Sequence, residues 1–336
     1  RDELPAGILR KSVLGLVLAA IVVGNAAYEG GNISGGVLGL QALGSTGIIE
    51  VAGYAINGYS LLIGAIAFIL LYIGNYKVLE KVFLLLVILM SLSFVITAIL
   101  TGPQLLTVLK GALIPQFPDG SILMIVALVG TTVVPYNLFL HASLVNQKWK
   151  DRSELYAAKK DTIVAVILGG LVSMSVIIAA AALSGQEVDG ASGLAQSLEP
   201  LYGSAARYCI GLGLFAAGIT SAITAPLAAA YVAQGCLNLG DDLKSRNFRL
   251  VWILVLILGV GVATFGIKPI EIIQFAQVAN GILLPVIAGI LIWLANRSTL
   301  LGSYQNSKLK NVISVCILIV TLILGARAIL SVFGLL

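Results

Sequence analysis

The stretch from Gly130 to His141 brings together polar groups that are unusual inside an apolar segment. It reads Gly-Thr-Thr-Val-Val-Pro-Tyr-Asn-Leu-Phe-Leu-His and carries the only histidine of the chain. In a bilayer, a helix-breaking proline is tolerated where protein or water satisfies the freed backbone groups. Polar and ionisable side chains at that depth mark ion and substrate paths. The stretch predicts a broken helix that can bind an ion, and a proline-kinked packing helix is the structural alternative.

A second polar group lies near the start of the chain. Asn25, Glu29 and Asn32 fall near one face of a helix at their spacing, and we call these three residues the polar stripe. Glu29 is the one acid well inside an apolar segment. The functional interpretation is a proton or ion path, and the structural one is polar contact between helices.

A third polar pair, Gln277 and Asn280, is three residues apart and shares a helix face. Together with Thr131, Thr132 and Asn137 it forms an oxygen-rich set. Hard cations such as Mg²⁺ and Mn²⁺ prefer oxygen ligands. No phosphate loop, cysteine–histidine zinc pattern or catalytic triad is visible, so we expect neither an enzyme nor a bound cofactor.

The composition identifies the elements that must position these groups. The chain is 59% hydrophobic and 10% charged, with a mean hydropathy of +1.05, whereas about a quarter of the residues of a soluble domain are charged. We predict an all-α polytopic membrane protein with the lipid bilayer as a partner. We therefore attribute the net charge of +5 to the placement of basic loops relative to the membrane, and we expect no nucleic-acid partner.

Nine apolar segments are long enough to cross a bilayer, for which about 20 residues suffice. We predict a single transmembrane domain, residues 1–336, with nine helices and a break at Val134–Pro135. The expected helices cover approximately residues 12–42, 58–74, 82–101, 121–146, 163–184, 206–238, 248–266, 270–295 and 310–335.

Lysine and arginine gather in alternate loops between these segments. One set of loops and ends holds sixteen of them, and the other set holds three: Lys110, Arg207 and Lys268. By the positive-inside rule, we expect a plasma-membrane protein with Arg1 in the cytoplasm and Leu336 outside.

The broken segment also carries a family resemblance. Residues Val134 to His141 look like the Met-Pro-His-Asn-Leu-Tyr-Leu-His signature of the Nramp transporters, which are proton-coupled importers of divalent metal ions. The likeness continues through residues 216–235 and 276–285, in the same order and spacing. It implies an inverted-repeat bundle like that of amino-acid/sodium symporters, which works by alternating access.

The resemblance has two departures. The nine segments correspond to the third to eleventh helices of the family, so the first helix with its Asp-Pro-Gly-Asn break is absent, the repeat is incomplete and the chain looks like a fragment. Val134 stands where the family has a metal-binding methionine, and Tyr136 where it has a histidine. Loss of the sulfur ligand favours harder ions, so we expect Mg²⁺ or Mn²⁺ as substrate.

What the resemblance implies for the site can be stated residue by residue. Thr131 matches a position whose backbone carbonyl binds metal, and Gln277 matches a glutamine that joins the metal. The implied metal site consists of Thr131, Val134, Asn137 and Gln277, with Thr132, Tyr136 and Asn280 as further lining.

For proton coupling, Asn25 stands near the place of a family aspartate, Glu29 is offset from a family glutamate, and His141 matches the second histidine. These three residues form the expected proton path, and uniport and symport both stay open. Two alternatives remain at this point: transport of an amino acid or another organic solute on the same fold, and a membrane protein that does not transport.

Overall fold

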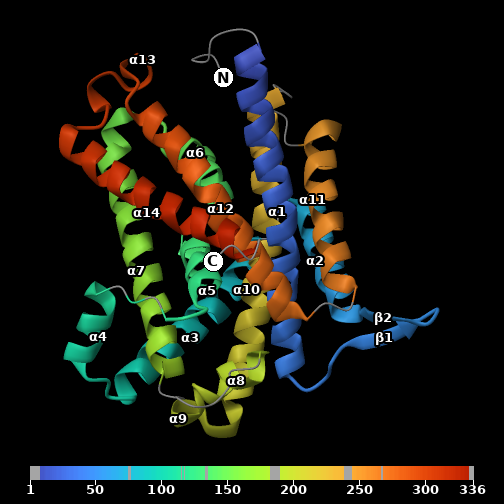
Figure 1. Cartoon of the computed structure of the whole chain (residues 1–336). Helices are drawn as coiled ribbons and strands as arrows, with labels where there is room; N and C mark the ends of the chain where they lie inside the picture. Colours follow the sequence, from blue (N-terminus) through green and yellow to red (C-terminus); the bar gives the residue numbers. More distant parts are fainter. Residues whose placement is uncertain are drawn as a thin grey trace.

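The structure, a computed structural model, describes residues 8–74, 77–114, 116, 118–132, 135–181, 190–237, 244–265 and 268–332. The described part is almost entirely helical (Figure 1). The helices are α1 (Ile8–Ala42), α2 (Gly58–Ile73), α3 (Lys77–Leu100), α4 (Leu105–Leu113), α5 (Ile122–Thr132), α6 (Pro135–Lys148), α7 (Leu155–Ala181), α8 (Gly190–Gln196), α9 (Glu199–Tyr202), α10 (Ala206–Leu237), α11 (Arg246–Thr264), α12 (Pro269–Ala295), α13 (Ser298–Leu301) and α14 (Lys308–Val332). Two strands, β1 (Ile48–Val51) and β2 (Tyr54–Asn57), form an antiparallel hairpin between α1 and α2.

Each predicted apolar segment overlaps a helix, and the segment at 121–146 overlaps two, α5 and α6. Within the described residues, five helices are long and apolar enough to cross a membrane, or six if the bent pair α12–α13 counts as one span. The chain is therefore a multi-pass membrane protein, as predicted. The count of nine crossings and the inverted repeat stay predictions.

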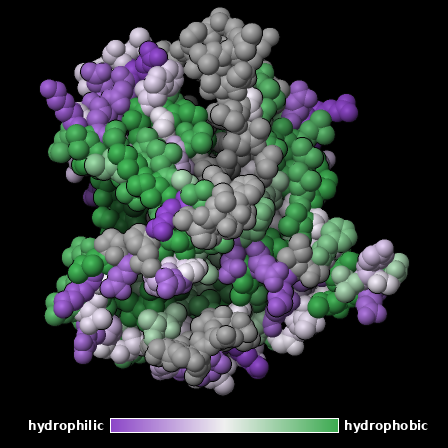
Figure 2. Space-filling model, viewed as in Figure 1, coloured by the Kyte–Doolittle hydropathy of each residue, from purple (hydrophilic) through white to green (hydrophobic). Residues whose placement is uncertain are grey.

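The exterior of the bundle fits a lipid environment. Hydrophobic residues cover much of the visible face, and hydrophilic ones gather at its upper corners and in patches across its lower half (Figure 2). Helix α7 is an example, since Val166 and Ile167 are more than half exposed. Such apolar surface, unfavourable in water, is what a helix presents to lipid.

The helix α1 occupies the centre of the fold and packs against α10, α11 and α12 (Figure 1). Its buried residues Ile33 and Val37 join Ile63 of α2, Ile219 of α10 and Trp252 of α11 in the main apolar core. A second group forms where α5, α12 and α14 pack together. The fold therefore places α12 between the central helix and the first half of the broken segment.

The helices α1 and α10 touch through their backbones at glycines. A Cβ atom added to Gly218 would lie 2.5 Å from both the Cα and the N of Gly36. One added to Gly39 would lie 2.5 Å from the backbone N of Phe215. Helices in lipid have no hydrophobic driving force to associate, and small residues allow the close backbone packing that holds them together. The glycines therefore set the distance between α1 and α10.

The ends of α2 are defined by local hydrogen bonds. The Asn57 side chain accepts a hydrogen bond of 3.0 Å from the backbone N–H of Tyr59 and caps the helix. At the other end, Gly74 adopts φ +66°, and its N–H donates to the carbonyl of Leu70 at 3.0 Å. These caps limit α2 to 16 residues.

We expect Gly218→Ala to destabilise the protein, because the new methyl group meets the backbone of Gly36, which cannot move aside like a side chain. Overpacking of this kind costs about 1–3 kcal/mol. The measurement is the temperature at which the detergent-solubilised protein loses its monodisperse gel-filtration peak.

The matched control is Gly235→Ala in the same helix, where an added Cβ meets nothing within 4 Å. Equal thermal stability of the two variants would contradict the backbone contact between α1 and α10.

Candidate functional site

The helices α5 (to Thr132) and α6 (from Pro135) flank the predicted break, and residues 133 and 134 between them lie outside the described residues. Whether the helix is interrupted there stays a prediction. Proline suits the first position of a helix because it has no N–H to leave unbonded. A helix that ended before Pro135 would leave its last carbonyls without partners of its own, and the partial negative charge of a helix C-terminus attracts cations.

The helix α12 runs beside this break and packs against both α5 and α6. Gln277 and Asn280 lie within α12, near the buried residues Ala276 and Leu284. The elements that carry the expected metal site therefore lie together, although they are far apart in the sequence.

The expected ligands occupy the ends that border the break. Thr131 and Thr132 are the last two residues of α5, and Tyr136 and Asn137 are the second and third of α6. The side chains of these four residues lie outside the described part of the structure, as do those of the α12 pair. Their role in metal binding stays a prediction.

The polar stripe on α1 is buried. Asn25, Glu29 and Asn32 are 2%, 0% and 9% exposed. All three turn from α1 toward α10 or α11, so the face predicted from their spacing exists. Burial of a polar group is costly unless it is hydrogen-bonded. The hydrogen-bond partners of the stripe therefore determine how costly its burial is.

Two amides of the stripe bond α10 near its proline. The Asn25 Nδ2 group donates to the carbonyl of Ala225 at 2.9 Å, and Asn32 Nδ2 donates to the carbonyl of Ser221 at 3.2 Å. Pro226 follows Ala225 directly and cannot donate a backbone hydrogen bond inside the helix. The two bonds tie α1 to the part of α10 where the helix is locally weakened.

The carboxyl group of Glu29 has few partners for a fully buried acid. Its Oε2 accepts a 3.3 Å hydrogen bond from Asn32 Nδ2, and its Oε1 has no partner among the described residues. Gly259 of α11 lies against this side chain, and a Cβ atom there would collide with Glu29 Cγ. A buried carboxylate is far more costly than a neutral carboxyl, and the role of Glu29 in a proton path stays a prediction.

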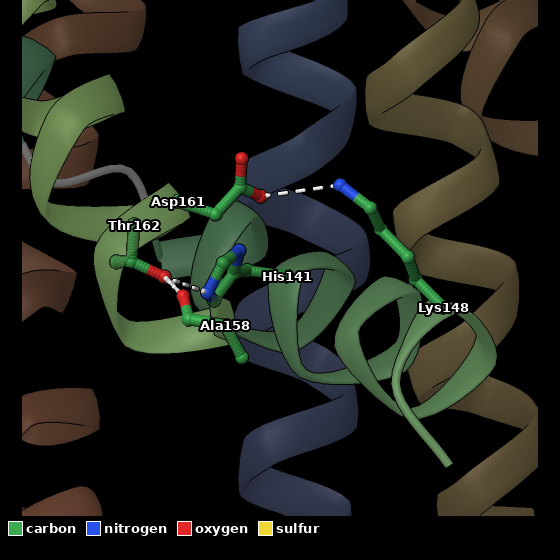
Figure 3. Close-up of polar contacts among 5 residues, drawn as sticks. All are labelled: His141, Lys148, Ala158, Asp161 and Thr162. Atoms are coloured by element: carbon green, nitrogen blue, oxygen red, sulfur yellow. Dashed lines mark hydrogen bonds and ion pairs between the residues drawn. The ribbon is translucent and has the colours of Figure 1, made fainter. Parts of the chain in front are cut away.

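His141 contacts α7 (Figure 3). Its Nε2 lies 3.2 Å from Thr162 Oγ1, and the same hydroxyl donates to the carbonyl of Ala158 at 3.0 Å. Because a hydroxyl has one proton, which Thr162 gives to Ala158, its oxygen is left to accept a hydrogen bond from His141 Nε2. Nearby, Lys148 Nζ and Asp161 Oδ2 are 3.5 Å apart, with both side chains about 60% exposed, so this ion pair adds little stability.

Glu29 and His141 are not brought together. The residue before the histidine, Leu140, packs against Ala225 and Ala228 of α10, with Tyr28 of α1 beside them. The helix α6 thus has one side on α10, while His141 points to α7. A proton path that uses both residues needs groups between them.

The sequence analysis did not single out Gly259 or Thr162. Gly259 belongs to a run of small residues at 259–263 whose partner on α1 the sequence cannot reveal. Thr162 stands just before the apolar segment expected at 163–184, and α7 begins earlier, at Leu155. Among the described residues, no three His, Cys, Asp or Glu side chains form a group that could hold a metal ion.

Comparison with known proteins links this arrangement to a family. The family model of natural resistance-associated macrophage protein-like (Nramp) proteins matches residues 1–331. The "divalent metal cation transporter MntH" of Erwinia tasmaniensis is 29% identical over 273 residues, which cover 77% of this chain and 64% of that protein.

Two further relatives carry the same name. The protein from Verminephrobacter eiseniae is 26% identical over 328 residues, or 94% of this chain and 71% of the relative. The protein from Klebsiella pneumoniae is 30% identical over 287 residues, or 79% of this chain and 67% of the relative. The matched region thus spans about two thirds of the length of these curated relatives.

Proposed function

We propose a transport function from one premise: the chain belongs to the Nramp family. Its relatives are transporters and not enzymes, which agrees with the expectation from sequence. We infer that the protein is a secondary transporter of divalent metal cations, with Mg²⁺ or Mn²⁺ preferred, and that it works by alternating access.

The observation that carries this proposal is the packing of α12 against both α5 and α6, the helices on either side of the predicted break, in a chain whose relatives are named for divalent metal cations. The carbonyl end of α5 and the amide oxygens of Asn137 and Gln277 would supply the ligands. Such ligands suit hard cations. Val134 adds no sulfur, which is the reason for preferring Mg²⁺ or Mn²⁺ over softer ions.

Alternating access requires one part of the bundle to move against another. The glycine contact and the two amide bonds between α1 and α10 favour these helices as the fixed part. The contacts of His141 and Lys148 with the first turns of α7 favour a joint movement of α6 and the start of α7. The break before Pro135 would then be the hinge.

We further propose that proton movement, where it accompanies the metal, uses Glu29. Its burial, its single donor Asn32 and its unpartnered Oε1 support this role. Asn25 would position α10 beside it, and His141 would serve at the α7 side of the path.

We expect Asn137→Ala and Gln277→Ala each to slow uptake of Mn²⁺ and Mg²⁺ by the protein in liposomes by roughly tenfold or more, the range seen when supporting groups of a metal site are lost. Thr131→Ala should slow it less, because the backbone carbonyl remains. The measurement is the initial rate at which the fluorescence of a metal-sensitive dye enclosed in the liposomes changes.

The control is Thr107→Ala, which removes an exposed hydroxyl on α4 that donates to Gln104 Oε1. Wild-type uptake by all three site variants would refute the site. If amino acids or other organic solutes inhibited metal uptake by the wild-type protein, that result would instead favour the organic-solute alternative.

We expect Glu29→Gln to transport metal without the proton entry that accompanies it in the wild type. Glutamine keeps the shape of the side chain and an oxygen that accepts from Asn32, but it carries no titrating proton. Metal-driven acidification inside liposomes, followed with a pH dye, is the measurement. The control is Glu50→Gln on the exposed hairpin, and acidification by Glu29→Gln equal to that of the control would exclude Glu29 from the path.

A further inference from the structure

The hairpin between α1 and α2 is amphipathic. In its antiparallel register, Ile49 lies opposite Ile56 and Val51 opposite Tyr54. Residues directly opposite share a face of a sheet, and so do residues two apart along a strand. All four therefore lie on one face, which has no polar group apart from the tyrosine hydroxyl.

The other face of the hairpin is more polar, and its pairs are Ile48 with Asn57 and Glu50 with Ala55. Glu50 is the only charged side chain of the two strands. The sequence therefore separates an apolar face from a face that carries the charge and the amide.

The apolar face is largely uncovered by the rest of the described chain. Ile49 is 48% exposed, Val51 51% and Tyr54 72%. Ile56, next to the start of α2, is partly buried. An isolated two-stranded hairpin is marginally stable in water, so an exposed face of this kind calls for a partner.

The length of α2 places the hairpin at a membrane surface. The 16 residues of α2 extend about 24 Å at 1.5 Å per residue, whereas the hydrocarbon core is about 30 Å thick. Any tilt shortens the reach further. Because Asn57 ends β2 and also caps α2, the hairpin begins at the depth where this short helix stops.

The direction of the hairpin agrees with that depth. It extends sideways from near the lower end of α11, across the direction in which α1 and α11 run (Figure 1). An element that leaves a transmembrane bundle sideways runs along the membrane surface and not into the water. It also continues the apolar exterior of α2, where Leu61 and Leu62 are exposed in the first turns.

We propose that the β1–β2 hairpin is a membrane-surface anchor, with the face of Ile49, Val51, Tyr54 and Ile56 inserted among lipid headgroups and upper acyl chains. Tyrosine is enriched at this level of the bilayer, where its ring is apolar and its hydroxyl meets water. Glu50, on the opposite face, points back toward the aqueous phase. The anchor compensates for the shortness of α2.

Lipid fits this face better than a second protein. Stable protein interfaces use roughly 20–30 residues on each side, whereas this face offers four. Four apolar side chains continuous with a lipid-facing helix need only the bilayer that already surrounds the bundle.

The test compares the two faces by spin labelling in vesicles of phosphatidylcholine and phosphatidylglycerol. With the three native cysteines (Cys209, Cys236 and Cys316) replaced by alanine, one label is placed at Val51→Cys or Ile49→Cys on the apolar face. The matched controls are Glu50→Cys and Ala55→Cys on the other face. Collision rates are measured with oxygen, which concentrates in lipid, and with a water-soluble nickel chelate.

We expect a higher ratio of oxygen to nickel collisions at 49 and 51 than at 50 and 55. Equal exposure of all four labels to nickel would place the hairpin in water and overturn the proposal. Shielding of 49 and 51 from both reagents, or dipolar broadening between labels, would mean a protein partner or a second copy and would also overturn it. Two positions on each face guard against a single variant that fails to fold.

Discussion

The contact between α1 and α10 is the constraint on which the rest of the structure depends. Gly36 and Gly218 allow the two backbones to touch, and Asn25 and Asn32 then reach carbonyls of α10 just before Pro226. A larger residue at Gly218 would meet the backbone of Gly36, separate the helices and break the amide bonds. Close packing and polar bonding thus stabilise each other at the place where the proline weakens α10.

This contact also fixes the two polar regions of the molecule. Glu29 lies against Gly259 of α11 and accepts from Asn32, which also bonds α10, while α12 packs against both α1 and α5. The buried acid therefore belongs to the tightly packed centre, and the predicted break before Pro135 falls where α5 and α6 meet α12. A closely packed centre beside a broken helix would give the proposed movement a physical basis.

Much of this arrangement could be predicted from the sequence, because apolar length and proline position act locally. Helices occupy the expected segments, and the residues of the polar stripe share a face as their spacing required. Sequence could not show that His141 bonds Thr162, since that depends on how α6 and α7 pack. It also missed the hairpin, whose strands of four residues lie outside the apolar segments. The metal ligands stay predictions.

The most direct test of the central claim, that a divalent cation passes the break at Val134, is a change in ion preference. Val134→Met restores a thioether, and Val134→Leu adds similar bulk without sulfur. We predict that the methionine variant transports Cd²⁺ better relative to Mg²⁺, because soft ligands select softer ions, whereas the leucine variant does not. The same Cd²⁺ to Mg²⁺ uptake ratio in wild type and both variants in liposomes would contradict the account.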